Sequence, residues 1–271
     1  MRERVPVPVV QQGRRGRRAL GVRVLWGGAE VAVTLGLVLL LFVVHQLWWT
    51  NRQARAAAER TVHALEEEWG ESSVEGGRGD SSSSSSPSAS PQASVPERSS
   101  PPSEASSGGG SSVRTGDPAP RWDQAYAILR IPEIGVRVPV AEGVSEGGVL
   151  DQGYVGHYPR TAQPGQAGNF ALAGHRNTHG EPFRYINRLR RGDELRVETR
   201  GAVYTYVVDK RLARTVARDG GVIRDVPRSE VREGHGYRAP GYYITLTTCT
   251  PEYTSKYRLV VWGTLRSMRP R

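Results

Sequence analysis

A run of fourteen residues without a charge, residues 31–44, is the feature that most limits what this chain can fold into. With its flanks it extends over about residues 27–49, and at about 1.5 Å per helical residue that length crosses a hydrocarbon layer roughly 30 Å thick. Trp26 lies at one end and Trp48 at the other, and amphipathic rings prefer the membrane interface. We therefore expect residues 24–49 to form one transmembrane helix.

The charges around this span predict its orientation. Residues 1–23 hold seven arginines and one glutamate, and positive flanks stay in the cytoplasm. We expect a cytoplasmic basic tail over residues 1–23, with everything after the span outside the cell membrane. A cleaved signal peptide has the same order of regions, but no A-x-A-like site follows Trp49 and the apolar stretch is long. The arginine pairs at 14–15 and 17–18 would suit a twin-arginine export signal, which nothing else supports.

The net charge of +10 carries little information about partners. Residues 1–23 contribute six of these ten units, because they hold seven arginines and one glutamate. Their charge sets the orientation of the span. A basic composition with this origin does not indicate a nucleic-acid partner. We expect a membrane protein that binds no nucleic acid.

Two further segments precede the folded domain. Residues 50–69 are rich in alanine, arginine and glutamate, which favours a juxtamembrane helix that ends at Gly70; a solvated extension is the alternative. Residues 70–118 are mainly serine, glycine and proline, with six consecutive serines at 81–86. Too few apolar side chains are present to offset the entropy of ordering them. We expect a disordered linker with an r.m.s. span of roughly 40 Å.

Residues 119–271 are expected to form the folded domain, because about 150 residues can bury one good core. Short runs that resemble strands alternate with turn signals, and only 183–189 suggests helical turns. The strand candidates are 125–131, 136–140, 169–173, 194–199, 202–212, 242–248 and 257–265. Closely spaced strands with few helices predict a mainly β domain that forms a closed or nearly closed barrel.

Cys249, the one cysteine of the chain, directly follows the strand candidate 242–248. It has no disulfide partner, so it is either a small buried apolar residue or a reactive thiol. A thiol that attacks a carbonyl needs a proton acceptor or a cationic neighbour, and then donors for the oxyanion. His175 follows the strand candidate 169–173, and Arg258 lies early in the last strand candidate. If the last two strands pair, Arg258 comes close to Cys249 and can hold an oxyanion without losing its charge.

Other residues are secondary candidates, and a structural role is an open alternative for each. Thr248 precedes the cysteine and could add to an oxyanion site through its side chain or backbone. Three more residues could line a groove for a peptide: Tyr154, Asn169 and Tyr253. His179 is the rival of His175 as the base. Acidic residues are scattered along the domain, so no metal site and no cofactor are expected.

Three segments, in this order, resemble the motifs of one enzyme family. The string TLTTC at 245–249 resembles the TLxTC signature of sortases, the cysteine transpeptidases of Gram-positive cell surfaces. Residues 156–176 resemble the approach to the sortase histidine, and 257–261 the strand that carries the sortase arginine. The resemblance covers residues 122–265. The end of the span, 46–51, is also similar to class E sortases of actinobacteria.

This resemblance implies a fold and a reaction. The fold would be the eight-stranded sortase β-barrel, and residues 119–271 the catalytic domain. Cys249 would attack the Thr–Gly bond of a C-terminal sorting signal of the LAxTG or LPxTG type, with His175 as its proton partner and Arg258 at the oxyanion or substrate. A thioester acyl-enzyme would then pass the surface protein to an amine of a peptidoglycan precursor. No metal or other cofactor is implied.

Two other classes remain as alternatives. An L,D-transpeptidase also pairs an exported cysteine with a histidine, but in a Ser-His-Gly-Cys-like setting, whereas Cys249 follows two threonines and precedes Thr250 and Pro251. A membrane-tethered wall-binding module with an inert buried cysteine would need no reactive thiol at all.

Overall fold

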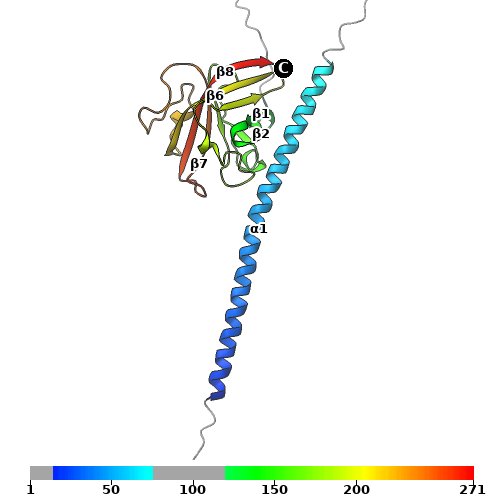
Figure 1. Cartoon of the computed structure of the whole chain (residues 1–271), viewed down its shortest axis with the longest axis vertical. Helices are drawn as coiled ribbons and strands as arrows, with labels where there is room; N and C mark the ends of the chain where they lie inside the picture. The colour runs from blue at the N-terminus through cyan, green and yellow to red at the C-terminus, as the bar shows by residue number, and fades with distance from the viewer. Residues whose placement is uncertain (1–14, 76–119) are drawn as a thin grey trace, which may run out of the picture.

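The computed structural model describes residues 15–75 and 120–271, which form one long helix and one β-barrel (Figure 1). The helix, α1, runs from Arg15 to Glu75. Most of the predicted basic tail, and the predicted linker from residue 76 on, lie outside the described residues.

Eight strands close into a barrel in the order β1-β2-β3-β4-β7-β8-β6-β5, and β5 pairs with β1. Their bounds are β1 Ala125–Ile131, β2 Val136–Glu142, β3 Val155–His157, β4 Gly168–Ala173, β5 Glu194–Glu198, β6 Ala202–Val216, β7 Tyr242–Thr250 and β8 Tyr257–Pro270. Four 3-10 turns connect them: η1 Pro132–Ile134, η2 Leu150–Gln152, η3 Ile186–Arg188 and η4 Gly220–Ile223. The mainly β, closed eight-stranded fold class expected from the sequence is confirmed.

The barrel is closed because its strands bury their apolar residues on one inner face. Alternate residues of β1 and β5, such as Leu129 and Val197, are buried in a single core that also contains Phe170, Leu172 and Leu246. Burial of this apolar surface is the main favourable contribution to folding. Central β7 is buried almost from end to end and pairs in parallel with β4 and antiparallel with β8.

The sequence missed two features of this barrel. β3 has three residues, Val155–His157, too few to show an alternating pattern. β7 extends to Thr250, so Cys249 lies within the strand and not after it. Of the helical turns expected over 183–189, only η3 forms.

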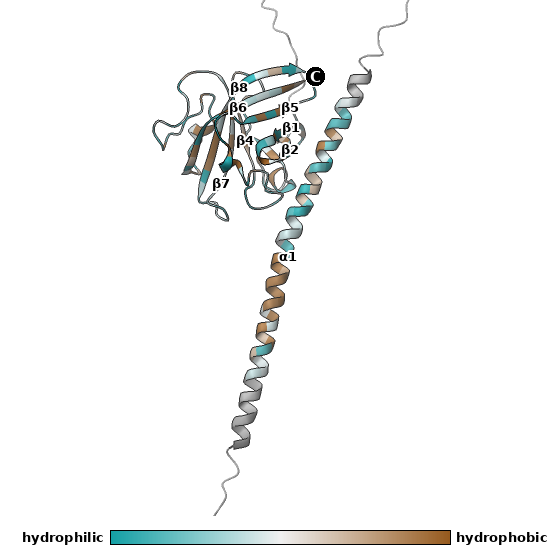
Figure 2. Ribbon diagram, viewed as in Figure 1, coloured by the Kyte–Doolittle hydropathy of each residue, from teal (hydrophilic) through white to brown (hydrophobic). Residues whose placement is uncertain are grey.

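The apolar part of α1 projects away from the barrel, and Figure 2 shows it as the brown stretch of the helix. Its large side chains, from Val31 to Val44, are more than half exposed in the protein. In the described part of the chain, this is the one helix long and apolar enough to cross a membrane. An exposed apolar surface of this extent fits a lipid environment.

The later part of α1 lies along the barrel beside β1 and β2 (Figure 1). Five residues spaced three or four apart form one buried stripe: Ala54, Ala58, Val62, Leu65 and Trp69. Such spacing places side chains on a single helix face. Val62, Leu65 and Trp69 pack on the outward-facing Ile128 of β1. The helix also passes through Gly70, where the sequence predicted its end, because one glycine costs only about 1 kcal/mol inside a helix.

Ion pairs flank this apolar contact. Glu66 of α1 bonds with Arg130 of β1 at 2.6 Å and with Arg137 of β2. Partial burial alone would raise the pKa of Glu66, but the hydrogen bonds and attraction from the two arginines outweigh it and lower the pKa. A lowered pKa in the folded state means that this carboxylate stabilises the docked helix above its ordinary pKa, and that the contribution is lost as the pH falls.

We therefore expect the Glu66→Gln variant to melt at a lower temperature than the unmodified chain at pH 7. The difference should shrink as the pH falls from about 5 to below the lowered pKa of Glu66, because the carboxylate is then protonated. The measurement is the thermal midpoint of the full chain in detergent across this pH range. Glu67→Gln, which removes an exposed acid from the same helix, is the control. A Glu66→Gln difference that does not change with pH would contradict the assignment.

Candidate active site

Cys249 lies near the end of β7, the strand held between β4 and β8. Its side chain is partly exposed, unlike the buried residues that precede it in the strand. This placement argues against an inert core cysteine and puts the thiol where a substrate can reach it.

Arg258 stands on one side of the cysteine. In the antiparallel ladder of β7 and β8, Cys249 is directly opposite Arg258, and such partners have Cα atoms about 4.5–5.5 Å apart. The guanidinium Nη1 donates to the backbone carbonyls of Ser255, at 2.8 Å, and Tyr257, at 3.1 Å. Its other N–H groups can donate to a substrate.

His175 approaches from the other side of β7. It follows Gly174, the residue after β4, whose N–H donates to the Thr247 carbonyl at 3.2 Å. The hydroxyl of Thr248 in turn donates to the Gly174 carbonyl at 2.7 Å. These two bonds extend the β4–β7 pairing to the residue before His175, so the histidine begins its loop beside Cys249.

Arg176 provides a further link that the sequence reasoning did not find. Its Nη1 donates to the backbone carbonyl of Cys249 at 3.2 Å and to Thr250 Oγ1 at 2.8 Å. The residue is almost fully buried, which is uncommon for arginine. The only signal in the sequence is its position after His175, and the abundance of arginine in this chain hides it.

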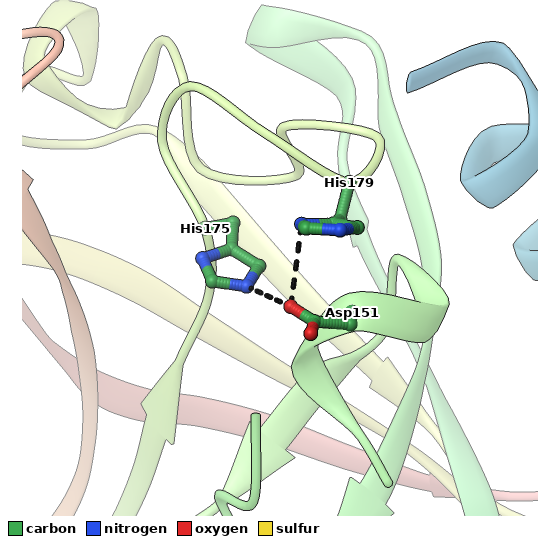
Figure 3. A group of neighbouring side chains, drawn as sticks. All are labelled: Asp151, His175 and His179. Carbon is green, nitrogen blue, oxygen red and sulfur yellow. Dashed lines mark hydrogen bonds and ion pairs between the residues drawn. The ribbon is translucent and has the colours of Figure 1, made fainter. Parts of the chain in front are cut away.

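Asp151, His175 and His179 form one group of neighbouring side chains (Figure 3), in which Asp151 is hydrogen-bonded to His175 and lies at ion-pair distance from His179. One carboxylate oxygen of Asp151, in η2, lies 2.9 Å from His175 Nε2 and 3.2 Å from His179 Nδ1. The two imidazole centroids are 5.3 Å apart. A carboxylate on Nε2 determines which ring nitrogen carries the proton, so Nδ1 of His175 is left to exchange protons with other groups.

The same three residues could hold a metal ion. Their ligand atoms all lie within 4.8 Å of one another, and two imidazoles with a carboxylate are ligands that Zn²⁺ accepts. Ligands around tetrahedral zinc are spaced by about 3.4 Å, given bonds of 2.0–2.1 Å. The sequence reasoning saw no such group because Asp151 is distant in sequence from both histidines. That the protein requires no metal stays a prediction.

Apart from His179, the secondary candidates are not members of the group of Asp151, His175 and His179. The Thr248 hydroxyl is buried and its proton is already donated to Gly174. Asn169 is fully buried at the far end of β4 and accepts from Thr245 at 2.7 Å. Tyr154 shares a hydrogen bond with Thr61 of α1 at 2.7 Å. Tyr253 is exposed in the β7–β8 loop. Of these, only Thr248 and Tyr253 are near the cysteine in the chain.

His157, the last residue of β3, lies in the barrel wall. It is completely buried, with Nδ1 2.6 Å from a Glu142 oxygen and Nε2 2.9 Å from the Thr161 hydroxyl. Both ring nitrogens of His157 therefore already have hydrogen-bond partners within the barrel.

Comparisons with known proteins show the family of this chain. The model of the sortase domain matches residues 129–266. Sortase SrtE1 of Streptomyces coelicolor is 39% identical over 99% of this chain, and Sortase SrtE2 of the same organism is 31% identical over 93%. The chain belongs to the sortase family. The sequence's resemblance to sortases, and to their class E, is confirmed, and sortases are cysteine transpeptidases. The chain spans 65% of the length of SrtE1 and 87% of that of SrtE2.

Solved sortase structures share the fold. A crystal structure of Sortase E1 from Streptomyces coelicolor with a tripeptide in the active site is 51% identical, with a TM-score of 0.52, and covers 56% of this chain and 94% of that one. The SrtF sortase from Corynebacterium diphtheriae is 27% identical, with a TM-score of 0.51, and covers 58% of this chain and 91% of that one. The L,D-transpeptidase and the non-enzymatic wall-binding module are therefore set aside.

The bond from Thr248 to Gly174 gives a prediction about stability. Thr248→Val keeps the shape of the side chain but leaves a buried carbonyl without its donor, which costs about 1–3 kcal/mol. We expect urea unfolding to show this loss for Thr248→Val and little loss for Thr248→Ser, which retains the hydroxyl. Equal stability of the valine variant and the unmodified chain would contradict the bond.

Proposed function

We propose that this sortase is a membrane-anchored transpeptidase that cleaves a C-terminal sorting signal of the LAxTG or LPxTG type between Thr and Gly and joins the new carboxyl end to an amine of a peptidoglycan precursor. Cys249 is the nucleophile, His175 the proton carrier and Arg258 the donor to the oxyanion. The observation that carries this proposal is the position of β7, which has Arg258 paired with Cys249 on one side and the histidine loop on the other.

The first half of the reaction forms a thioester. The Cys249 sulfur attacks the threonine carbonyl carbon, and negative charge develops on the carbonyl oxygen. Arg258 donates to that oxygen and keeps its charge throughout. When the tetrahedral intermediate collapses, the C–N bond to glycine breaks and His175 gives its proton to the departing amine.

The second half reverses these roles. An incoming amine attacks the thioester carbonyl, His175 takes a proton from the amine, and the sulfur of Cys249 leaves as the new amide bond forms. Activity requires a thiolate together with an imidazolium in the first half, so the pH–rate profile is bell-shaped and its two limbs belong to the coupled pair.

Asp151 supports this cycle as a positioning residue. Its carboxylate lies 2.9 Å from His175 Nε2, which leaves Nδ1 as the nitrogen that gives and takes the proton.

The membrane location rests on α1. Its apolar stretch is exposed in the protein, and the seven arginines before residue 24 favour a cytoplasmic N-terminus. The catalytic barrel would then lie outside the cell, where surface proteins with sorting signals and wall precursors are found.

The test uses the full chain in detergent with LAxTG and LPxTG peptides and a glycine-type amine. We expect the transfer product, identified by mass spectrometry, to disappear with Cys249→Ala and His175→Ala. Arg258→Ala should reduce the rate by about 10²- to 10³-fold, as loss of an oxyanion donor does. Arg258→Lys should retain part of the transfer rate, because lysine keeps the positive charge. Absence of cleavage of both peptides by the unmodified protein would overturn the proposal.

Replacement of Asp151 tests its positioning role. Asp151→Asn removes the charge but keeps the size, and we expect kcat to fall by about tenfold with a small change in KM, because Asn can also present its NH₂ to His175 and favour the wrong tautomer. Steady-state kinetics over a range of pH measure this. The control is Glu146→Gln, an exposed acid that precedes η2. An unchanged kcat and pH profile for Asp151→Asn would remove Asp151 from the mechanism.

A further inference from the structure

The two loops that carry Asp151, His175 and His179 both rest on the same short stretch of α1. Asp151 lies in η2, which is followed directly by Gly153, and the histidines lie in the loop that continues to Gly180 and Glu181. The contacts of these loops with residues 51–61 of the helix involve side chains and backbone of both partners. The helix thus contacts the histidine side of the site.

The peptide of Gly180 is held from two sides by the helix. Its N–H donates to Asn51 Oδ1 at 3.3 Å, and its carbonyl accepts from Arg55 Nε at 3.0 Å. The neighbouring Glu181 carboxylate is buried and accepts from Asn51 Nδ2 at 3.1 Å and from Arg55 Nη2 at 3.0 Å. Two helix side chains therefore supply four hydrogen bonds to two consecutive loop residues.

These loop residues have an unusual backbone. His179, Gly180 and Glu181 have φ angles of +49°, +83° and +55°, in the left-handed region that residues other than glycine rarely adopt. Such a conformation persists when its surroundings hold it in place. Phe183 closes the base of the loop by donating to the His175 carbonyl at 3.0 Å, while Asn51 and Arg55 bind its tip.

The second loop is fitted to the helix by close contact. A Cβ on Gly153 would lie 2.8 Å from the Ala54 carbonyl oxygen, so only glycine allows α1 to approach η2 this closely. The next residue, Tyr154, shares its hydroxyl hydrogen bond with Thr61. Asp151, two residues before Gly153, is therefore positioned against the same helix as the loop of His179.

We propose that the juxtamembrane part of α1, residues 50–69, is a positioning element of the active site, which holds the Asp151 and His175–His179 loops in the geometry that proton transfer needs. The proposal rests on the function proposed above for His175. The buried stripe from Ala54 to Trp69 and the ion pairs of Glu66 fix this stretch on the barrel. Catalysis is then fastest when the helix is docked.

The docked helix also determines where the site lies relative to the membrane. Asn51 is two residues after Trp49, the last residue of the expected span, which is a rise of about 3 Å along the helix. The histidine loop is therefore held at the height of the lipid headgroups. A substrate that is itself anchored in the membrane would present its sorting signal at this height.

The test compares two variants of the full chain in lipid nanodiscs. Asn51→Ala with Arg55→Ala removes the four bonds to Gly180 and Glu181. Arg60→Ala is the control, because Arg60 is an exposed arginine of the same helix that donates to Ala56 of that helix. The readouts are kcat and KM for peptide transfer, and hydrogen–deuterium exchange of the segment 174–186 by mass spectrometry.

We expect the double variant to lose about tenfold or more in kcat, with KM changed less than twofold, because small displacements of a catalytic group slow the reaction strongly. Exchange in 174–186 should become faster, while Arg60→Ala behaves as the unmodified chain. Arg55→Lys alone, which keeps one donor, should show an intermediate loss and decides the question if the double variant does not fold.

Two results would overturn the proposal: a double variant equal to Arg60→Ala in both readouts, or faster exchange with an unchanged kcat. If the unmodified chain transfers no peptide, the proposed function fails, and exchange alone then decides whether α1 holds the loop. Faster exchange in the double variant would support the positioning role in that case, and unchanged exchange would overturn it.

Discussion

The pairing of β7 with β4 on one side and β8 on the other is the constraint on which the rest of the site depends. It joins three segments from distant parts of the chain in one ladder. The antiparallel register sets Cys249 opposite Arg258, and the parallel register brings the end of β4, and with it His175, alongside Thr247 and Thr248. Because strand register is specified by buried apolar residues such as Leu172 and Leu246, the core that stabilises the barrel also aligns the site.

The two sides of the site are held in different ways. Cys249 and Arg258 lie in regular strands, whose backbone hydrogen bonds leave little freedom. His175 begins a loop, and the loop is held by side chains: Thr248 and Arg176 tie its first residues to β7, and Asn51 and Arg55 bind its tip. Loops have fewer buried backbone hydrogen bonds than strands and open more easily. Contacts from outside the barrel, such as those of α1, can therefore change the geometry of the histidine side of the site.

The helix α1 has two functions in this picture. Its apolar half is suited to lipid, and its later half is amphipathic and packs on β1 through Val62, Leu65 and Trp69. A single helix that does both would connect a membrane to the barrel by a stiff element. The orientation of the site relative to the apolar half of α1 thus follows from docking of the helix. Glu66 and its two arginines add a pH-dependent contribution to the stability of the docked helix.

The sequence alone determined the elements with strong local signals: the span around residues 31–44, the barrel strands with alternating or continuous apolar runs, and the motifs around His175, Cys249 and Arg258. These signals are local because periodicity and motif spacing need only neighbouring residues. Tertiary packing alone establishes three sets of contacts: Asp151 with both histidines, Arg176 with the Cys249 carbonyl, and Asn51 and Arg55 with Gly180 and Glu181. Those pairs are far apart in the chain, and a polar residue's partner depends on how the strands and α1 pack, which no local pattern records.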